Sequence, residues 1–226
     1  MPTPRARLLT IRFSHYCEKA RWALERAGVP FDEESHAPIF HMPFVKRAGG
    51  QRATPVLVWD GRVIDDSTAI LKAVHARVPA AGLYPEALAD EVLAVEEELD
   101  EALGPAARRG AYDHGPPSPA ATPAPFRLAE SPAPLRASLP VTRPLLASGI
   151  RAALKIDPPG VARSRVKLEQ VLATTGERLA RAEAEGRRYL VGDRFTAADL
   201  TLAALLVPVA MPERCGVAEH EVPRGL

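Results

Sequence analysis

The sequence predicts an α/β N-terminal domain followed by an all-helical C-terminal domain. In the first 80 residues, short apolar runs of strand length alternate with helical patterns, whereas beyond residue 86 the periodic segments have helical spacing. We place the two domains at residues 1–80 and 86–226. Nine prolines between Pro116 and Pro144 predict an irregular Pro-rich insertion at about residues 115–145, because no helix tolerates that density of proline.

The composition is that of an ordinary globular protein and excludes several functions. The 226 residues carry 29 basic and 28 acidic side chains, so a net charge of +1 predicts no binding to nucleic acid or an anionic membrane. Two cysteines cannot form a disulfide framework, and the six histidines lack metal-ligand spacing. The longest apolar run, residues 200–211, is shorter than the roughly 20 residues that span a bilayer. Without a signal-peptide pattern, we expect a cytoplasmic protein.

The elements of the N-terminal domain are predicted in a distinctive order. They are a strand at 8–13, a helix at 16–27, a strand at 30–35, an irregular stretch, strands at 56–59 and 62–64, and a helix at 67–78. Gly28 ends the first helix, and the Asp60–Gly61 turn joins the last two strands as a hairpin. A helical crossover allows the first two strands to be parallel. This order is the thioredoxin-like arrangement.

Three long helices are predicted in the C-terminal domain, at residues 86–103, 163–185 and 196–207. The first is acidic with an apolar stripe, and the third is so apolar that we expect it to be central. Thr196 and Asp199 form a capping box that begins the third helix.

The segment from Ser14 to Cys17 lies where the first strand leads into the first helix. A group at this place faces unpaired backbone N–H donors and the positive end of the helix dipole, which together stabilise a thiolate. Two functional interpretations follow. Either Cys17 is itself a reactive thiol, or Ser14 donates a hydrogen bond to the thiolate of a bound thiol. The structural alternative is that Ser14 caps the helix and Cys17 packs in the core.

Two further junctions carry candidate binding residues. Thr54 precedes Pro55, and in thioredoxin-like folds the matching proline is cis while the residue before it offers its backbone to a bound peptide. Pro55 could also be a trans proline that opens a strand. At the next junction, the Ser67 hydroxyl and the helix N-terminus can bind a carboxylate, and Asp66 can attract an ammonium group. The same pair is also an ordinary helix cap.

Three segments, in this order and spacing, are similar to the glutathione S-transferase family. They are FSHYCEKARWALERAG, ATPVLVWDGRVIDDSTAIL and YLVGDRFTAADLTLAALL. The resemblance implies a thioredoxin-like domain that binds glutathione and a helical domain that forms the wall of the electrophile pocket. It also implies that Ser14 activates the glutathione thiol, that Thr54 pairs with the cysteinyl backbone, and that Asp66 and Ser67 hold the γ-glutamyl head. The candidates for binding the glycyl carboxylate are His41, Lys46, Gln51 and Arg52.

The function implied by this resemblance is attack by the glutathione thiolate on small hydrophobic electrophiles, a detoxification reaction. Two alternatives remain: a thiol oxidoreductase that uses Cys17, and a non-catalytic or degenerate scaffold. Another low-molecular-weight thiol could replace glutathione, and the resemblance implies a homodimer. The Pro-rich insertion and the short sequence after Val207 depart from the helices of the family, so we expect an incomplete electrophile pocket.

Overall fold

The computed structural model describes residues 6–114, 141, 148–152 and 154–210. The nine prolines of the predicted insertion and the sequence after Ala210 lie outside these residues. No helix in the described ranges is long and apolar enough to cross a membrane.

The N-terminal domain has the predicted thioredoxin-like order. Its elements are β1 (Ala6–Thr10), α1 (His15–Arg26), β2 (Phe31–Ser35), α2 (Met42–Ala48), β3 (Val56–Trp59), β4 (Arg62–Asp65) and α3 (Ser67–Arg77). The sheet order is β2-β1-β3-β4, with β1 parallel to β2 and antiparallel to β3, and with β3 antiparallel to β4. The predicted crossover and hairpin are therefore both confirmed.

The stretch that we expected to be irregular contains the short helix α2. Pro43 stands in its first turn, where a missing backbone N–H costs no helical hydrogen bond. Gly49 ends the helix with φ of 95°, a left-handed conformation that glycine adopts at little cost. The local proline and glycine signals therefore mark the two ends of a helix here.

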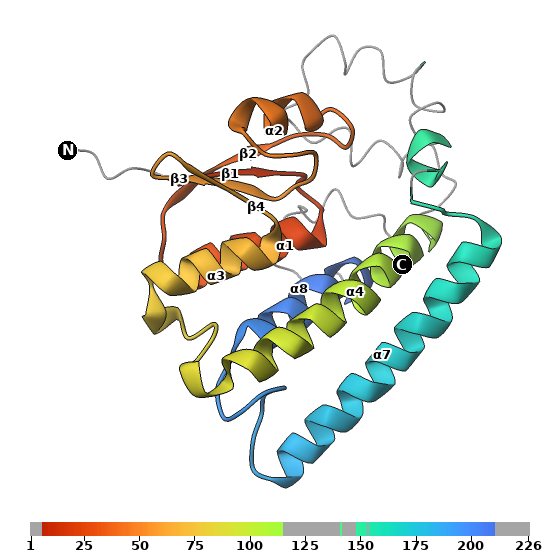
Figure 1. Ribbon diagram of the computed structural model, residues 1–226. Coiled ribbons are helices and arrows are strands. Elements are labelled where there is room, and N and C mark those ends of the chain that lie inside the picture. The colour runs from red at the N-terminus through yellow and green to blue at the C-terminus, as the bar shows by residue number, and fades with distance from the viewer. Residues whose placement is uncertain (1–5, 115–140, 142–147, 153, 211–226) are drawn as a thin grey trace.

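Figure 1 shows how the layers are arranged. Helix α2 covers one face of the sheet, and α1 and α3 cover the other. Helices α1 and α3 thereby lie between the sheet and the helical domain, so the beginning of α1 can contact both domains.

The helical domain begins after two short turns of 3₁₀ helix, Pro79–Ala81 and Glu86–Leu88. Its long helices are α4 (Ala89–His114), α7 (Pro158–Ala184) and α8 (Ala197–Ala210). Helix α4 continues well past the predicted end at residue 103 and includes Pro105. An internal proline costs about 3 kcal/mol. Burial of the small residues that follow it, Ala106 and Ala107, favours continuation of the helix.

Helix α8 is central, as its apolar sequence predicts, because it packs against both α1 and α4. The capping box at its start is also confirmed. The Asp199 carboxylate accepts the backbone N–H of Thr196 at 2.9 Å and that of Leu190 at 2.8 Å. Helix α7 packs on α4 and buries Val171. Val171 of α7 thereby joins the apolar core that α4 and α8 form.

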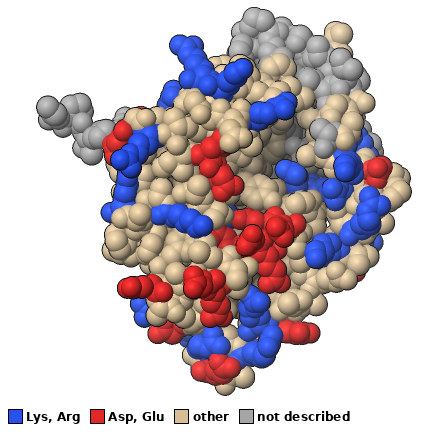
Figure 2. Space-filling model, viewed as in Figure 1, with Lys and Arg blue, Asp and Glu red and all other residues tan. Residues whose placement is uncertain are grey.

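Exposed charges in the middle of α4 differ in sign from those in the first part of α7. Figure 2 shows acidic side chains gathered over the middle of α4 and basic side chains beside them, along α7. Glu97 and Glu101 are exposed on α4, and Arg163 and Lys167 are exposed on α7. The near-neutral chain thus has local patches of each sign.

Candidate functional site

The N-terminus of α1 brings three predicted residues together. Ser14 is the N-cap residue, with extended backbone and with no capping hydrogen bond from its side chain. Instead, the side chains of Ser14 and Thr54 lie beside the thiol of Cys17 and each lowers its pKa. The Ile11 N–H also points at this sulfur, with an N–Sγ distance of 3.4 Å. The hydroxyl of Ser14 is thus held at the first turn of α1 without being used by the helix.

Cys17 itself is completely buried. Burial raises the pKa of its thiol, and the hydrogen bonds from Thr54, Ile11 and Ser14 do not offset that effect. A reactive cysteine needs a lowered pKa and access to solvent. The environment of Cys17 is the opposite of the one that nucleophilic attack requires.

The backbone at Thr54 lies next to this cluster. The Thr54–Pro55 peptide bond is cis, as in the thioredoxin-like arrangement. The described pairing of β3 begins at Val56, opposite Leu9 of β1 and Asp65 of β4. Thr54 therefore precedes the sheet ladder, and its backbone groups are not part of that ladder.

The turn between β4 and α3 gathers three more of the predicted residues. Asp66 caps α3, with its Oδ1 accepting the Ala69 N–H at 3.1 Å, and Ser67 is buried in the first turn. The Gln51 backbone N–H donates to Asp65 Oδ2 at 2.7 Å, which places Gln51 beside the same turn. Asp66, Ser67 and Gln51 thus form a second cluster.

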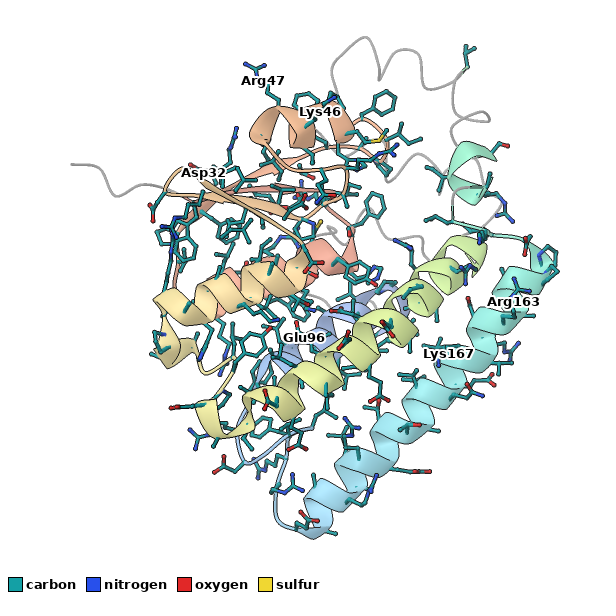
Figure 3. The ribbon with its side chains drawn as sticks, viewed as in Figure 1. Asp32, Lys46, Arg47, Glu96, Arg163 and Lys167 are labelled. Atoms are coloured by element: carbon teal, nitrogen blue, oxygen red, sulfur yellow. The ribbon has the colours of Figure 1, made fainter. Side chains whose placement is uncertain are left out.

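Lys46 stands apart from both clusters. It lies on the exposed side of α2, beside Arg47, and α2 covers the face of the sheet away from α1 (Figure 3). Lys46 has no hydrogen bond or ion pair with another residue that the structure describes. His41 and Arg52 are joined by a contact of 3.1 Å between His41 Nε2 and the Arg52 carbonyl oxygen.

A buried ionic network that the sequence reasoning missed joins α1, α3 and α4. Lys19 Nζ lies 2.6 Å from Asp100 Oδ2 and 2.8 Å from Glu96 Oε1. Thr68 Oγ1 lies 3.0 Å from Lys19 Nζ, and Tyr84 donates to Glu96 Oε2 at 2.6 Å. Figure 3 shows Glu96 between α3 and α4. The network therefore joins α1, which follows Ser14, and α3, which follows Asp66, to α4.

A second contact between the domains lies one helical turn further along α4. The Tyr16 hydroxyl donates to the Asp100 carbonyl oxygen at 2.9 Å, and a Cβ at Gly104 would approach that hydroxyl to 2.0 Å. His15 is buried and hydrogen-bonds to the Gly104 backbone. Burial lowers the pKa of His15 to about 3, with a further contribution from the charge of Arg108. His15 is therefore neutral at pH 7.

A shallow hollow between α4 and α7, lined by Val95, Leu99, Thr174 and Arg178 among others, contains none of the predicted site residues. The candidate site is the surface formed by the first turns of α1 and α3 and the segment before β3. This arrangement of a thioredoxin-like domain and a helical domain defines the glutathione transferase fold.

The comparisons with known proteins agree with this fold. Residues 8–82 match the model of the glutathione S-transferase N-terminal domain family. This match covers the thioredoxin-like domain and does not extend into the helical domain. No curated protein sequence matches the chain.

Solved structures of similar fold cover most of the chain. The β-etherase LigF from Sphingobium sp. strain SYK-6 has a TM-score of 0.66 at 19% identity, covering 93% of this chain and 85% of its own. A glutathione transferase from Phanerochaete chrysosporium has a TM-score of 0.65 at 19% identity, over 91% and 84% of the two chains. The theta class glutathione S-transferase from Xanthomonas axonopodis pv. citri, with glutathione bound, has a TM-score of 0.61 at 19% identity, over 88% and 80%.

Proposed function

We propose that the protein is a glutathione transferase-like enzyme that joins the thiol of glutathione to small electrophiles. The observation that carries this proposal is the Ser14 hydroxyl, which stands at the N-terminus of α1 without capping it. The hydroxyl can rotate to donate to a thiolate, and the helix dipole favours negative charge at the same place. A structure of similar fold has glutathione bound, which supports glutathione as the thiol.

The two clusters suggest how the tripeptide would lie. The backbone of Thr54, beside the cis Pro55, would pair with the cysteinyl residue and so place its sulfur near Ser14. Asp66 and Ser67 at the beginning of α3 would hold the ammonium and carboxylate of the γ-glutamyl end. Of the candidates for the glycyl carboxylate, Gln51 lies beside the same turn, whereas Lys46 lies on the exposed side of α2, so we favour Gln51 over Lys46.

The proposed reaction needs little from the protein beyond binding and thiolate stabilisation. The thiol loses its proton to solvent, because Ser14 and the helix N-terminus stabilise the resulting anion. The thiolate sulfur then forms a bond to the electrophilic carbon, and the leaving group departs with the electron pair of the broken bond.

We further propose that the enzyme is cytoplasmic and a homodimer, and that another low-molecular-weight thiol could take the place of glutathione.

The test is a comparison of Ser14→Ala with Cys17→Ala. Conjugation of glutathione to 1-chloro-2,4-dinitrobenzene is followed by absorbance, and glutathione binding is measured separately by calorimetry. Loss of one donor to the reacting anion lowers kcat by about 10²- to 10³-fold, so we expect that loss in Ser14→Ala with binding retained. Cys17→Ala serves as the matched control and should keep kcat within a few-fold.

Three outcomes contradict parts of the proposal. Unchanged activity in Ser14→Ala rules out the serine mechanism. Loss of activity in Cys17→Ala together with rapid alkylation of native Cys17 supports the oxidoreductase instead. Glutathione binding without turnover of several electrophiles identifies a scaffold.

A further inference from the structure

Arg108 belongs to the part of α4 that contacts the beginning of α1. It lies four residues after Gly104 and therefore on the same face of α4, which is the face that packs against Tyr16. Its charge acts on both His15 and Tyr16, the two residues that follow Ser14. Arg108 therefore lies on the part of α4 that neighbours His15 and Tyr16.

Among the residues that the structure describes, none compensates the charge of Arg108 by an ion pair. Arg108 is partly buried, yet it has no hydrogen bond or ion pair with any residue in the described part of the chain. Asp100, which lies two turns earlier on the same face of α4, is bound to Lys19. Taking a guanidinium with five N–H donors partly out of water without a partner costs free energy. A bound anion would remove that cost.

Two other arginines differ from Arg108 because each has hydrogen-bonding partners among the described residues. Arg109, the next residue, is bound to the Leu154 carbonyl and to the Ser164 hydroxyl, so it ties α4 to the segment before and within α7. Arg21 is bound to Glu18 and Glu33. Beside Arg108, His15 is 3% exposed and its Nε2 has no hydrogen-bond partner among the described residues. Within the described part of the chain, Arg108 and the Nε2 of His15 therefore both have unused hydrogen-bonding capacity.

We propose that Arg108 binds a carboxylate of the acceptor substrate, so that the enzyme prefers electrophiles that carry a carboxylate. This inference rests on the proposed function, which places the thiol at Ser14. The planar guanidinium fits a carboxylate through two parallel hydrogen bonds. The β4–α3 turn and Thr54 would hold the thiol, so α4 is left for the second substrate. Arg108 also offsets the repulsion between an anionic substrate and the thiolate.

The test uses a matched pair of substrates, 4-chloro-3-nitrobenzoate and its methyl ester. In both, the glutathione sulfur replaces chloride on the ring, and they differ in charge at a distant position. For Arg108→Gln we expect kcat/KM for the benzoate to fall about 10- to 100-fold, the usual effect of losing a charge-assisted hydrogen bond. The value for the ester should change less than threefold. Arg188→Gln, which removes an exposed charge elsewhere, should leave both values unchanged.

A carboxylate of glutathione could also be the anion, and calorimetry separates the two sources. We expect Arg108→Gln to bind glutathione as the wild type does. If glutathione binding weakens in the variant, and the glycyl ethyl ester of glutathione shows no such weakening, Arg108 belongs to the thiol site and the proposal is wrong. An equal loss of kcat/KM for benzoate and ester also overturns it. Arg108→Lys keeps the charge but not the planar fork, and it should recover part of the preference for the benzoate. Such a recovery would show that the loss in Arg108→Gln does not come from misfolding.

Failure of this inference can be told from failure of the proposed function by a binding measurement that needs no turnover. Binding of 4-nitrobenzoate is measured by calorimetry for wild type and Arg108→Gln. If no electrophile is turned over but 4-nitrobenzoate binds in an Arg108-dependent way, the conjugation function fails and the carboxylate site stands. If conjugation depends on Ser14 but 4-nitrobenzoate binding is the same in both proteins, the carboxylate site fails alone.

Discussion

Lys19 Nζ on α1 lies 2.8 Å from Glu96 Oε1 on α4, and neither side chain is exposed to solvent. This ion pair joins the thioredoxin-like domain to the helical domain close to the N-termini of α1 and α3. Buried ion pairs add little net stability over a well-packed apolar pair, but breaking one leaves an uncompensated charge in the interior. Each member of the network therefore depends strongly on the others.

Lys19→Met should lower the free energy of unfolding by about 3 to 5 kcal/mol, because Glu96 and Asp100 would remain buried without their cation. Urea denaturation followed by circular dichroism measures the change. Lys72→Met, which removes an exposed lysine from α3, is the control and should change stability by less than about 0.5 kcal/mol. Equal stabilities for the two variants would show that the Lys19 network is not a structural requirement.

Gly104→Ala should destabilise the contact between α1 and α4. The added Cβ would lie 2.0 Å from the Tyr16 hydroxyl, so Tyr16 must move and give up its hydrogen bond to the Asp100 carbonyl. Overpacking of this kind costs about 1 to 3 kcal/mol. Gly176→Ala is the matched control, because no described atom lies within 4 Å of its Cβ position in α7. It should raise stability by about 0.5 to 1 kcal/mol, and a similar gain in Gly104→Ala would contradict the contact.

His15 should make the protein less stable in acid. Its pKa is lowered to about 3 in the folded protein by burial and by Arg108, whereas an unfolded chain takes up this proton near pH 6.5. Acid therefore favours the unfolded chain between these two values, by up to about 1.4 kcal/mol per pH unit. The stability that neutral His15 contributes is fully present above pH 6.5 and is lost as the pH falls.

Urea denaturation of wild type and His15→Gln at pH 4.5, 5.5 and 6.5 measures this dependence. The difference between the two proteins should shrink toward lower pH, since the variant has no imidazole to protonate. Parallel pH profiles would mean that His15 titrates normally in the folded protein.

Asp199→Ala should weaken the beginning of α8. The carboxylate accepts backbone N–H groups of Leu190 and Thr196 at 2.8 and 2.9 Å, and both donors lose their partner in the variant. Loss of the cap and of these bonds costs about 2 to 4 kcal/mol. Asp193→Ala removes a carboxylate whose side chain is 71% exposed and should have almost no effect. Thermal unfolding ranks the two variants, and the reverse order would refute the capping role.

Most of the fold could be predicted from the sequence because its signals are local. The apolar periodicities locate the strands and helices, and the Asp60–Gly61 turn identifies the hairpin. The candidate residues Ser14, Thr54 and Asp66 were found because each stands at a junction between elements. The sequence pattern predicts neither helix α2 nor the last turns of α4. Each of these segments contains a proline, a residue that usually interrupts a helix, yet Pro43 and Pro105 both lie within helices.

The parts of the site contributed by α4 could not be predicted in the same way. Lys19 and Glu96 are far apart in the sequence, and a charged residue in an amphipathic helix is usually assigned to solvent. One signal was present: Glu96 and Asp100 follow Val92 at steps of four residues and so continue its buried face. Arg108 carries no signal in the sequence, because its importance depends on the absence of partners among the residues that the structure describes.

The bonds between α1 and α4 have a consequence for ligand binding. Lys19, Tyr16 and His15 each join α1 to α4. The beginning of α1, with Ser14, and the part of α4 that carries Arg108 are therefore held in place by the core of the protein. A ligand that touches both of these segments meets a preorganised surface and does not have to bring the domains together. Its affinity is therefore not reduced by the entropy of closing a hinge.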